Sequence, residues 1–84
     1  MEWDVVDVKV MPDFSLWVRF RDGIEGVIHC SPTFFRGVFA PLHDPLQFAS
    51  VAIVDGVLTW LDNLDLAPDA MHTEIKQHGY WKLE

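Results

Sequence analysis

The sequence predicts a single α+β domain over residues 1–84, built on an N-terminal three-stranded antiparallel meander. Short helices, a second β-hairpin and a C-terminal helix packed on the sheet complete this expectation. Three observations predict it: apolar and polar residues alternate between residues 3 and 30, Asp55-Gly56 is a strong hairpin dipeptide, and Pro68 opens a helical stretch. With 84 residues and no internal repeat, the chain has room for one hydrophobic core.

The first two strands are predicted by the alternation of their side chains. Residues 3–11 form the first expected strand, with Val6, Val8 and Val10 on one face and polar residues on the other. A proline-containing turn follows. Residues 14–20 form the second expected strand, whose core face consists of Phe14, Leu16, Val18 and Phe20.

The loop of residues 21–23 sets the register of the next hairpin. A two-residue Asp-Gly turn would place Glu25 opposite Phe20, inside the core, because a one-residue slip exchanges the two faces of a strand. A three-residue loop with Gly23 in the left-handed region places Glu25 opposite Arg19 instead, which is a favourable cross-strand pair. We therefore expect the three-residue loop, followed by a third strand.

The second face of this meander carries aromatic and charged residues. It consists of Trp17, Arg19, Glu25 and Val27, with Trp17 and Val27 paired across the strands. If helices cover only the core face, Trp17 lies in a surface patch that is available to a partner. The chain has eleven aromatic residues (four Trp, six Phe and one Tyr), so it either packs an unusually aromatic core or keeps an apolar patch for a partner.

Cap and turn residues predict the elements that follow the meander. Proline after Ser or Asp is typical of a helix start, and Asp-Gly is typical of a tight hairpin. The apolar tail at residues 80–83 is expected to add an edge strand or to contact another chain. The other expected elements are short helices at residues 32–36 and 45–48, strands at 50–54 and 57–60, and a last helix at 68–77.

The charge of the chain argues against nucleic acid partners, and its hydropathy argues against a membrane span. Thirteen acidic and six basic residues give a formal net charge of −7, and the basic residues are scattered rather than gathered into a phosphate-binding stripe. No apolar run approaches the roughly 18 residues of a membrane span.

The single cysteine, Cys30, favours a reducing compartment, so we expect a cytoplasmic protein. No phosphate-binding glycine loop is present, and no cofactor is expected.

Pairs of reactive side chains are present, but they carry no catalytic or metal-binding signature. His29 and Cys30 are neighbours on a strand, so their side chains point to opposite faces and cannot share a ligand. His72 and His78 are six residues apart, whereas a metal-binding pair on a helix needs a spacing of three or four. We predict no catalytic residue and no metal ligand, and we expect Cys30 to be a buried structural thiol.

The most distinctive segment is residues 60–69. Asp62, Asp65 and Asp69 lie close together there with Asn63, a composition typical of calcium-binding loops. Such loops also need a glycine at the sharp turn and a bidentate glutamate at the end, and neither is in place. We favour a strand-to-helix loop with Asp69 at the positive end of the helix, which leaves this loop as the best single candidate for a functional site.

The same segment resembles a family signature. The residues that carry the resemblance are Trp60, Asn63, Asp65, Leu66, Ala67, Pro68 and Asp69. They are similar to a motif of small bacterial proteins in the domain of unknown function 2442 family (DUF2442), and the Phe20-x-Asp22-Gly23 hairpin is a further anchor. Leu64 departs from the glycine usual in that motif. The resemblance implies a meander with flanking helices, no known catalytic residue or cofactor, and in some relatives a co-encoded small partner protein.

The acidic charge and the aromatic surplus favour a non-catalytic protein-interaction module. We expect its partner to be a co-encoded small protein, which the chain binds as an antitoxin-like or regulatory partner. Two alternatives stay open: a small-ligand-binding or enzymatic domain that uses the loop of residues 60–69, and a self-associating structural protein that forms a homodimer. The residues expected to take part are Trp17, Trp60, Asn63, Asp65, Pro68 and Asp69.

Overall fold

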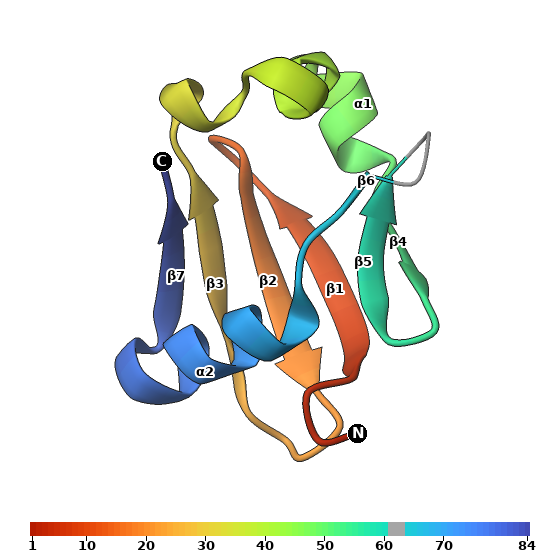
Figure 1. Cartoon of the computed structure of the whole chain (residues 1–84), viewed down its shortest axis with the longest axis vertical. Helices are drawn as coiled ribbons and strands as arrows, with labels where there is room; N and C mark the ends of the chain where they lie inside the picture. The colour runs from red at the N-terminus through yellow and green to blue at the C-terminus, as the bar shows by residue number, and fades with distance from the viewer. Residues whose placement is uncertain (61–63) are drawn as a thin grey trace.

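The computed structural model describes residues 1–60 and 64–84 and has the predicted α+β architecture (Figure 1). Within these residues, the strands of the main sheet are β1 (Val5–Met11), β2 (Ser15–Phe20), β3 (Glu25–Cys30) and β7 (Tyr80–Leu83). Their order across the sheet is β1-β2-β3-β7. The first three are antiparallel neighbours, as the meander predicts, and β7 lies parallel to β3 as the expected edge strand.

A second, smaller sheet contains the predicted Asp-Gly hairpin. Its strands are β4 (Ala52–Val54), β5 (Val57–Trp60) and β6 (Leu64–Asp65). Asp55 and Gly56 both have positive φ, 51° and 79°, which confirms the tight turn. The sequence interpretation expected only a loop after Trp60. The structure corrects it, because β6 pairs antiparallel with β5 and satisfies backbone groups along the edge of that strand.

In the described part of the chain, four helical segments connect the strands. They are the 3₁₀ segments η1 (Pro32–Phe34) and η2 (Gly37–His43) and the α-helices α1 (Pro45–Ala49) and α2 (Pro68–His78). The two α-helices match the prediction: the Leu46 N–H donates a 3.0 Å hydrogen bond to the Asp44 carboxylate at the start of α1, and Gly79 ends α2 in the left-handed conformation. No helix of residues 1–60 or 64–84 is long and apolar enough to cross a membrane.

The segment η1 is shorter than the helix predicted for residues 32–36. The backbone leaves the helical region at Phe35, with φ −81° and ψ 71°. The reason lies in the core, where the Phe35 side chain is buried and its ring centroid lies 5.0 Å from that of Phe14. Packing of this ring replaces the second turn of the expected helix.

A β-bulge decides which valine of β1 faces the core. The register shifts between Val5 and Asp7, so Val6 is the extra residue. Val5 is 2% exposed and Val6 is 47% exposed. The simple alternation predicted from Val6 to Val10 therefore breaks at the start of β1, where the bulge makes Val5 rather than Val6 the buried valine.

The turn between β1 and β2 also differs from the expectation. The alternation placed Phe14 in the second strand, but Asp13 and Phe14 have positive φ values of 60° and 56° and belong to the turn. This conformation is rare for a bulky residue and costs about 1–3 kcal/mol. Ring packing offsets the cost, since the Phe14 centroid lies 5.0 Å from Phe35, 5.3 Å from Phe48 and 5.4 Å from His43.

The hairpin of β2 and β3 has the predicted three-residue loop. Arg19 pairs with Glu25 and Trp17 pairs with Val27, while Gly23 adopts a φ of 90°. The register, and with it the assignment of the two faces, is confirmed. The core face of β2 is buried as predicted at Leu16, Val18 and Phe20.

The hydrophobic core lies between one side of the main sheet and the helices. The helix α2 crosses the sheet on the side seen in Figure 1, where α1 and the second sheet lie at one end and flank of the sheet. Met71 and Ile75 lie one turn apart on α2, so they share a face of the helix, and both are buried in this core. No helix or strand of the described residues covers the other side of the sheet, where alternate side chains remain exposed.

Candidate functional site

The open side of the main sheet, called the outer face below, is formed by every second residue of its strands. Side chains alternate along a strand, so one set on each strand points away from the core. The strand register arranges these residues in three rows across the sheet. They are Asp7, Lys9 and Met11 on β1, Ser15, Trp17 and Arg19 on β2, Glu25, Val27 and His29 on β3, and Tyr80 and Lys82 on β7.

The central row of the outer face is aromatic and apolar. The register places Lys9, Trp17, Val27 and Tyr80 side by side. Trp17 and Val27 are half-buried, and Tyr80 is 50% exposed. The Lys9 ammonium lies 5.2 Å from the centroid of the Trp17 ring, and the Arg19 guanidinium lies 5.8 Å from it. Cation–π attraction at these distances holds both cations beside the indole ring.

The row nearest the β2–β3 loop is charged. Arg19 stands between Asp7 and Glu25 in the register, and Arg19 Nη2 lies 3.7 Å from Asp7 Oδ2. Both side chains of this ion pair are almost half exposed, so the solvent screens it and it adds little to stability. The pair therefore contributes to the charge pattern of the outer face and little to the stability of the fold.

The row at the other end of the outer face is polar. Ser15 Oγ lies 3.1 Å from His29 Nδ1, and Lys82 Nζ lies 3.2 Å from Glu84 Oε1 at the edge of the sheet. A serine nucleophile would also need a carboxylate that orients the histidine. The neighbour of His29 on β7 is Lys82, which has the opposite charge. We therefore assign a structural role to the Ser15–His29 contact, in which Ser15 is buried and His29 is exposed.

The outer face contains several residue types that are enriched at protein interfaces. Trp, Tyr, Met and Arg are enriched at interfaces, and the outer face contains one residue of each type. Its centre is apolar and its margin is charged, which is the usual arrangement of an interface. Over residues 1–60 and 64–84, no group of three His, Cys, Asp or Glu side chains could hold a metal ion.

Trp60, the first residue of the predicted loop site, belongs to the core. It is 4% exposed, and its indole Nε1–H donates a 2.9 Å hydrogen bond to the Phe48 carbonyl at a separation of twelve residues. The Trp60 and Phe48 rings lie 6.1 Å apart. Trp60 therefore fastens α1 to the second sheet, which is a structural role.

The other residues of the predicted loop site have diverse positions. Pro68 is the first residue of α2, and Asp69 lies in its first turn, where a carboxylate stabilises the positive helix end. Asp65 lies in β6, and both Asp65 and Asp69 are exposed. Asn63, with Asp62, lies outside the described residues. The ligand-binding or enzymatic role of this loop stays a prediction.

A contact between Asp22 and His72 is the main polar feature that sequence reasoning missed. The largely buried His72 has its Nε2 atom 2.7 Å from Asp22 Oδ2. The hydrogen bond from His72, followed by the one from the Ile24 N–H, lowers the pKa of the Asp22 carboxyl below its usual 3.8. The available signal was weak: Asp22 lies in the hairpin motif and His72 adjoins the core residue Met71, but fifty residues separate the pair.

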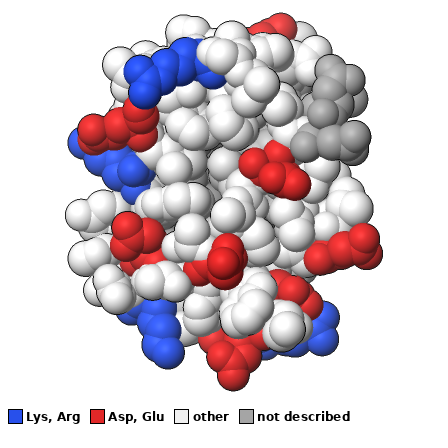
Figure 2. Space-filling model, in the orientation of Figure 1, with Lys and Arg blue, Asp and Glu red and all other residues white. Residues whose placement is uncertain are grey.

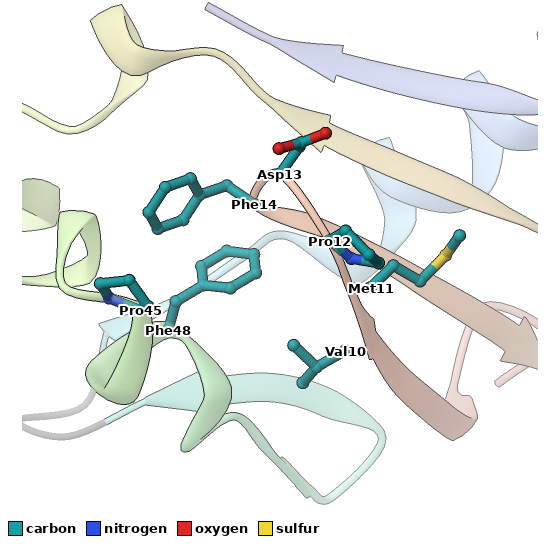
Figure 3. Close-up of a pocket in the computed structure, with 7 residues that line it drawn as sticks. All are labelled: Val10, Met11, Pro12, Asp13, Phe14, Pro45 and Phe48. Carbon is teal, nitrogen blue, oxygen red and sulfur yellow. The ribbon is translucent and has the colours of Figure 1, made fainter.

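A shallow apolar pocket lies between the β1–β2 turn and α1 (Figure 3). The Phe14 and Phe48 rings meet edge to face at 5.3 Å, and the Asp13 carboxylate points away from the Phe48 ring. The pocket volume of about 220 Å³ is below the roughly 300–1,000 Å³ of typical small-molecule sites, which makes it a weaker candidate than the outer face. The lining residues are Val10, Met11, Pro12, Asp13, Phe14, Pro45 and Phe48.

Cys30 and His29 lie on opposite sides of the sheet, as strand alternation predicts. Cys30 is buried in the core and His29 is exposed on the outer face. Burial raises the pKa of the Cys30 thiol to about 12. The reactive thiolate is therefore scarce at neutral pH, and Cys30 is the structural thiol that the sequence predicts.

The chain is a small α+β protein, and the described helices and strands leave one side of its main sheet open. The chain belongs to the DUF2442 family: the family model described as "Protein of unknown function (DUF2442)" matches residues 5–77 of the 84. The resemblance of the Trp60 to Asp69 segment is thereby confirmed. No curated protein and no solved structure matches the chain.

Proposed function

We propose that the chain is a non-catalytic protein-interaction module that binds a protein partner through the outer face. The observation that carries this proposal is the position of Trp17. It lies in the middle of the central row, between Lys9 and Val27, on a sheet side that the described helices and strands leave open. Tryptophan is among the residue types most enriched at the energetic hot spots of interfaces, and hot spots cluster near the interface centre.

The proposal includes the type of partner and its compartment. The family resemblance supports a co-encoded small protein, which the chain would bind as an antitoxin-like or regulatory partner. A second copy of the chain is the other partner that fits the outer face. The unpaired thiol of Cys30 supports a reducing, cytoplasmic location.

Binding through the outer face can be tested with two truncations. The chain is co-expressed with the product of the adjacent gene, and the pair is separated by size-exclusion chromatography at micromolar concentration. We expect co-elution for the wild type and for Leu46→Ala, which removes an 81% exposed side chain from α1. We expect Trp17→Ala to raise the dissociation constant about 30-fold, because truncation of a hot spot costs about 2 kcal/mol.

Two results would count against this function. Separate elution of the two wild-type proteins would exclude the co-encoded protein as the partner of this chain. A complex that tolerates Trp17→Ala but not Leu46→Ala would move the binding surface from the outer face to α1.

A further inference from the structure

The outer face is the electrically balanced part of an acidic molecule. Lys9, Arg19 and Lys82 are three of the six basic residues of the chain. Asp7 and Glu25, with Glu84 beside Lys82 at the edge, are only three of the thirteen acidic ones. The other charged residues of the chain, three basic and ten acidic, account for the whole excess of −7. Figure 2 shows the side opposite the outer face, where Asp and Glu are spread across the surface while Lys and Arg lie near its margin.

This charge distribution limits how two copies of the chain can approach each other. Contact through most other surfaces brings net negative charges together, and like charges repel over the Debye length of about 8 Å at physiological salt. Contact through the outer face carries no such net repulsion. The aromatic centre of the outer face is also the part of that surface that gains most from leaving water.

The rows of the outer face are complementary to themselves. On β1, Asp7 and Lys9 point to the same side two residues apart. A two-fold axis parallel to the rows, midway between the central row and the row of Asp7 and Arg19, reverses the strand direction and brings Trp17 of each copy opposite Arg19 of the other. Lys9 of each copy then approaches Asp7 of the other, so the two contacts are reciprocal, as closed dimers require.

The area of the outer face limits how much surface such a dimer can bury. Four strands about 4.8 Å apart, each about six residues long at about 3.3 Å per residue, span roughly 400 Å². A standard interface buries about 800 Å² on each partner. The dimer therefore belongs to the class of small, weak interfaces, which bury less than about 1,200 Å² in total.

We propose that the outer face binds a second copy of this chain, face to face and with antiparallel strands. This inference rests on the proposed function and names the partner of the same surface. The neutral, aromatic outer face is then the dimer interface. Both Trp17 and the charges around it are expected to determine the dissociation constant of the dimer.

Sedimentation velocity from about 10 µM to 1 mM tests the proposal directly. We expect the 9.7 kDa chain to sediment as a monomer at the low end and increasingly as a dimer at the high end. Trp17→Ala should raise the dissociation constant about 30-fold, and Leu46→Ala should leave it unchanged. A wild-type chain that remains monomeric at 1 mM overturns the proposal.

Charge reversal tests the face-to-face arrangement. Lys9→Glu gives the outer face an excess of two negative charges, and Glu25→Lys gives it an excess of two positive charges. We expect each variant alone to dimerise at least ~10-fold more weakly than the wild type, and an equimolar mixture of the two to regain wild-type dimerisation. The matched controls, Arg36→Glu and Glu2→Lys, change the net charge by the same amounts outside the outer face and should have little effect.

The outcomes separate this proposal from the proposed function. A mixture no stronger than either variant, or controls as damaging as the outer-face variants, overturns self-association. If the chain stays monomeric yet binds the co-encoded protein in a Trp17-dependent way, the second copy is excluded and the interaction module stands. If the chain dimerises through Trp17 and captures no other protein, self-association is supported and the co-encoded partner is excluded.

Discussion

His72 Nε2 donates a 2.7 Å hydrogen bond to Asp22 Oδ2 and so ties the β2–β3 loop to α2. The imidazole ring also meets the Phe20 ring edge to face, with centroids 4.9 Å apart. Asp22 has a second structural task, because its other carboxylate oxygen accepts a hydrogen bond of 3.1 Å from the Ile24 N–H. One carboxylate therefore fixes the conformation of the loop and the position of the helix above it.

This contact predicts an acid-dependent loss of stability. The pKa of Asp22 is lowered in the folded state, so its contribution is fully present above the usual value of 3.8 and disappears as the pH falls through the lower, folded value. Asp22→Asn keeps an acceptor for Ile24 but loses the charge. We expect a lower urea midpoint for Asp22→Asn at pH 7, and we expect the two midpoints to converge as the pH falls below 3.8. The exposed Asp65→Asn serves as the control, and a constant difference across this pH range would refute the assignment.

A side chain at position 26 is predicted to destabilise the fold, because it would overlap with the end of α2. A Cβ at this position would lie 2.5 Å from the Gly79 carbonyl oxygen and 2.6 Å from Ile75 Cγ2, so the end of α2 rests directly on the backbone of β3. Gly26→Ala must push α2 away from the sheet, and overpacking of this kind costs about 1–3 kcal/mol. Urea denaturation measures the loss. The neighbouring surface variant Glu25→Ala should change stability by less than about 0.5 kcal/mol, and equal losses would contradict this explanation.

Trp60 predicts that the loss of a single hydrogen bond destabilises the fold. Trp60→Phe keeps an aromatic ring but leaves the Phe48 carbonyl without its 2.9 Å donor. An unsatisfied buried acceptor costs about 1–3 kcal/mol, to which the smaller ring adds a cavity. In a domain of this size each 1 kcal/mol lowers Tm by about 4–8 °C, so we expect a drop of at least about 4 °C. Trp17→Phe on the outer face should leave Tm nearly unchanged, and a similar drop in both variants would refute the distinction.

The elements that the sequence predicted correctly depend on local rules. The register of the β2–β3 hairpin follows from side-chain alternation, because only one register keeps Glu25 out of the core. The Asp55-Gly56 turn and the ends of α2 depend on residues with narrow backbone preferences. These signals lie within a few residues of the feature they specify, and each was confirmed.

The features that the sequence did not reveal depend on tertiary packing. Val5 and Val6 are identical in type, so only the bulge decides which of them is buried. Phe14 leaves the strand because its ring packs against distant aromatic residues. The motif that contains Trp60 was recognisable in the sequence. The Phe48 carbonyl of α1, which accepts the hydrogen bond from the Trp60 indole, was not predictable from it. The outer face was predicted only as Trp17 with three neighbours, since the place of β7 beside β3 was needed to complete it.

The buried position of Cys30 predicts very slow thiol chemistry. Burial raises its pKa to about 12, so at pH 8 only about one molecule in 10⁴ carries a thiolate, and the core shields even that fraction. We expect iodoacetamide to leave the native protein unmodified over hours and to label it within minutes in 8 M urea, as read by intact mass. Gly26→Ala, which loosens the contact of α2 with the strand that carries Cys30, should label faster than the wild type under native conditions. Rapid labelling of the native wild-type protein would show that Cys30 is accessible and would contradict its burial in the core.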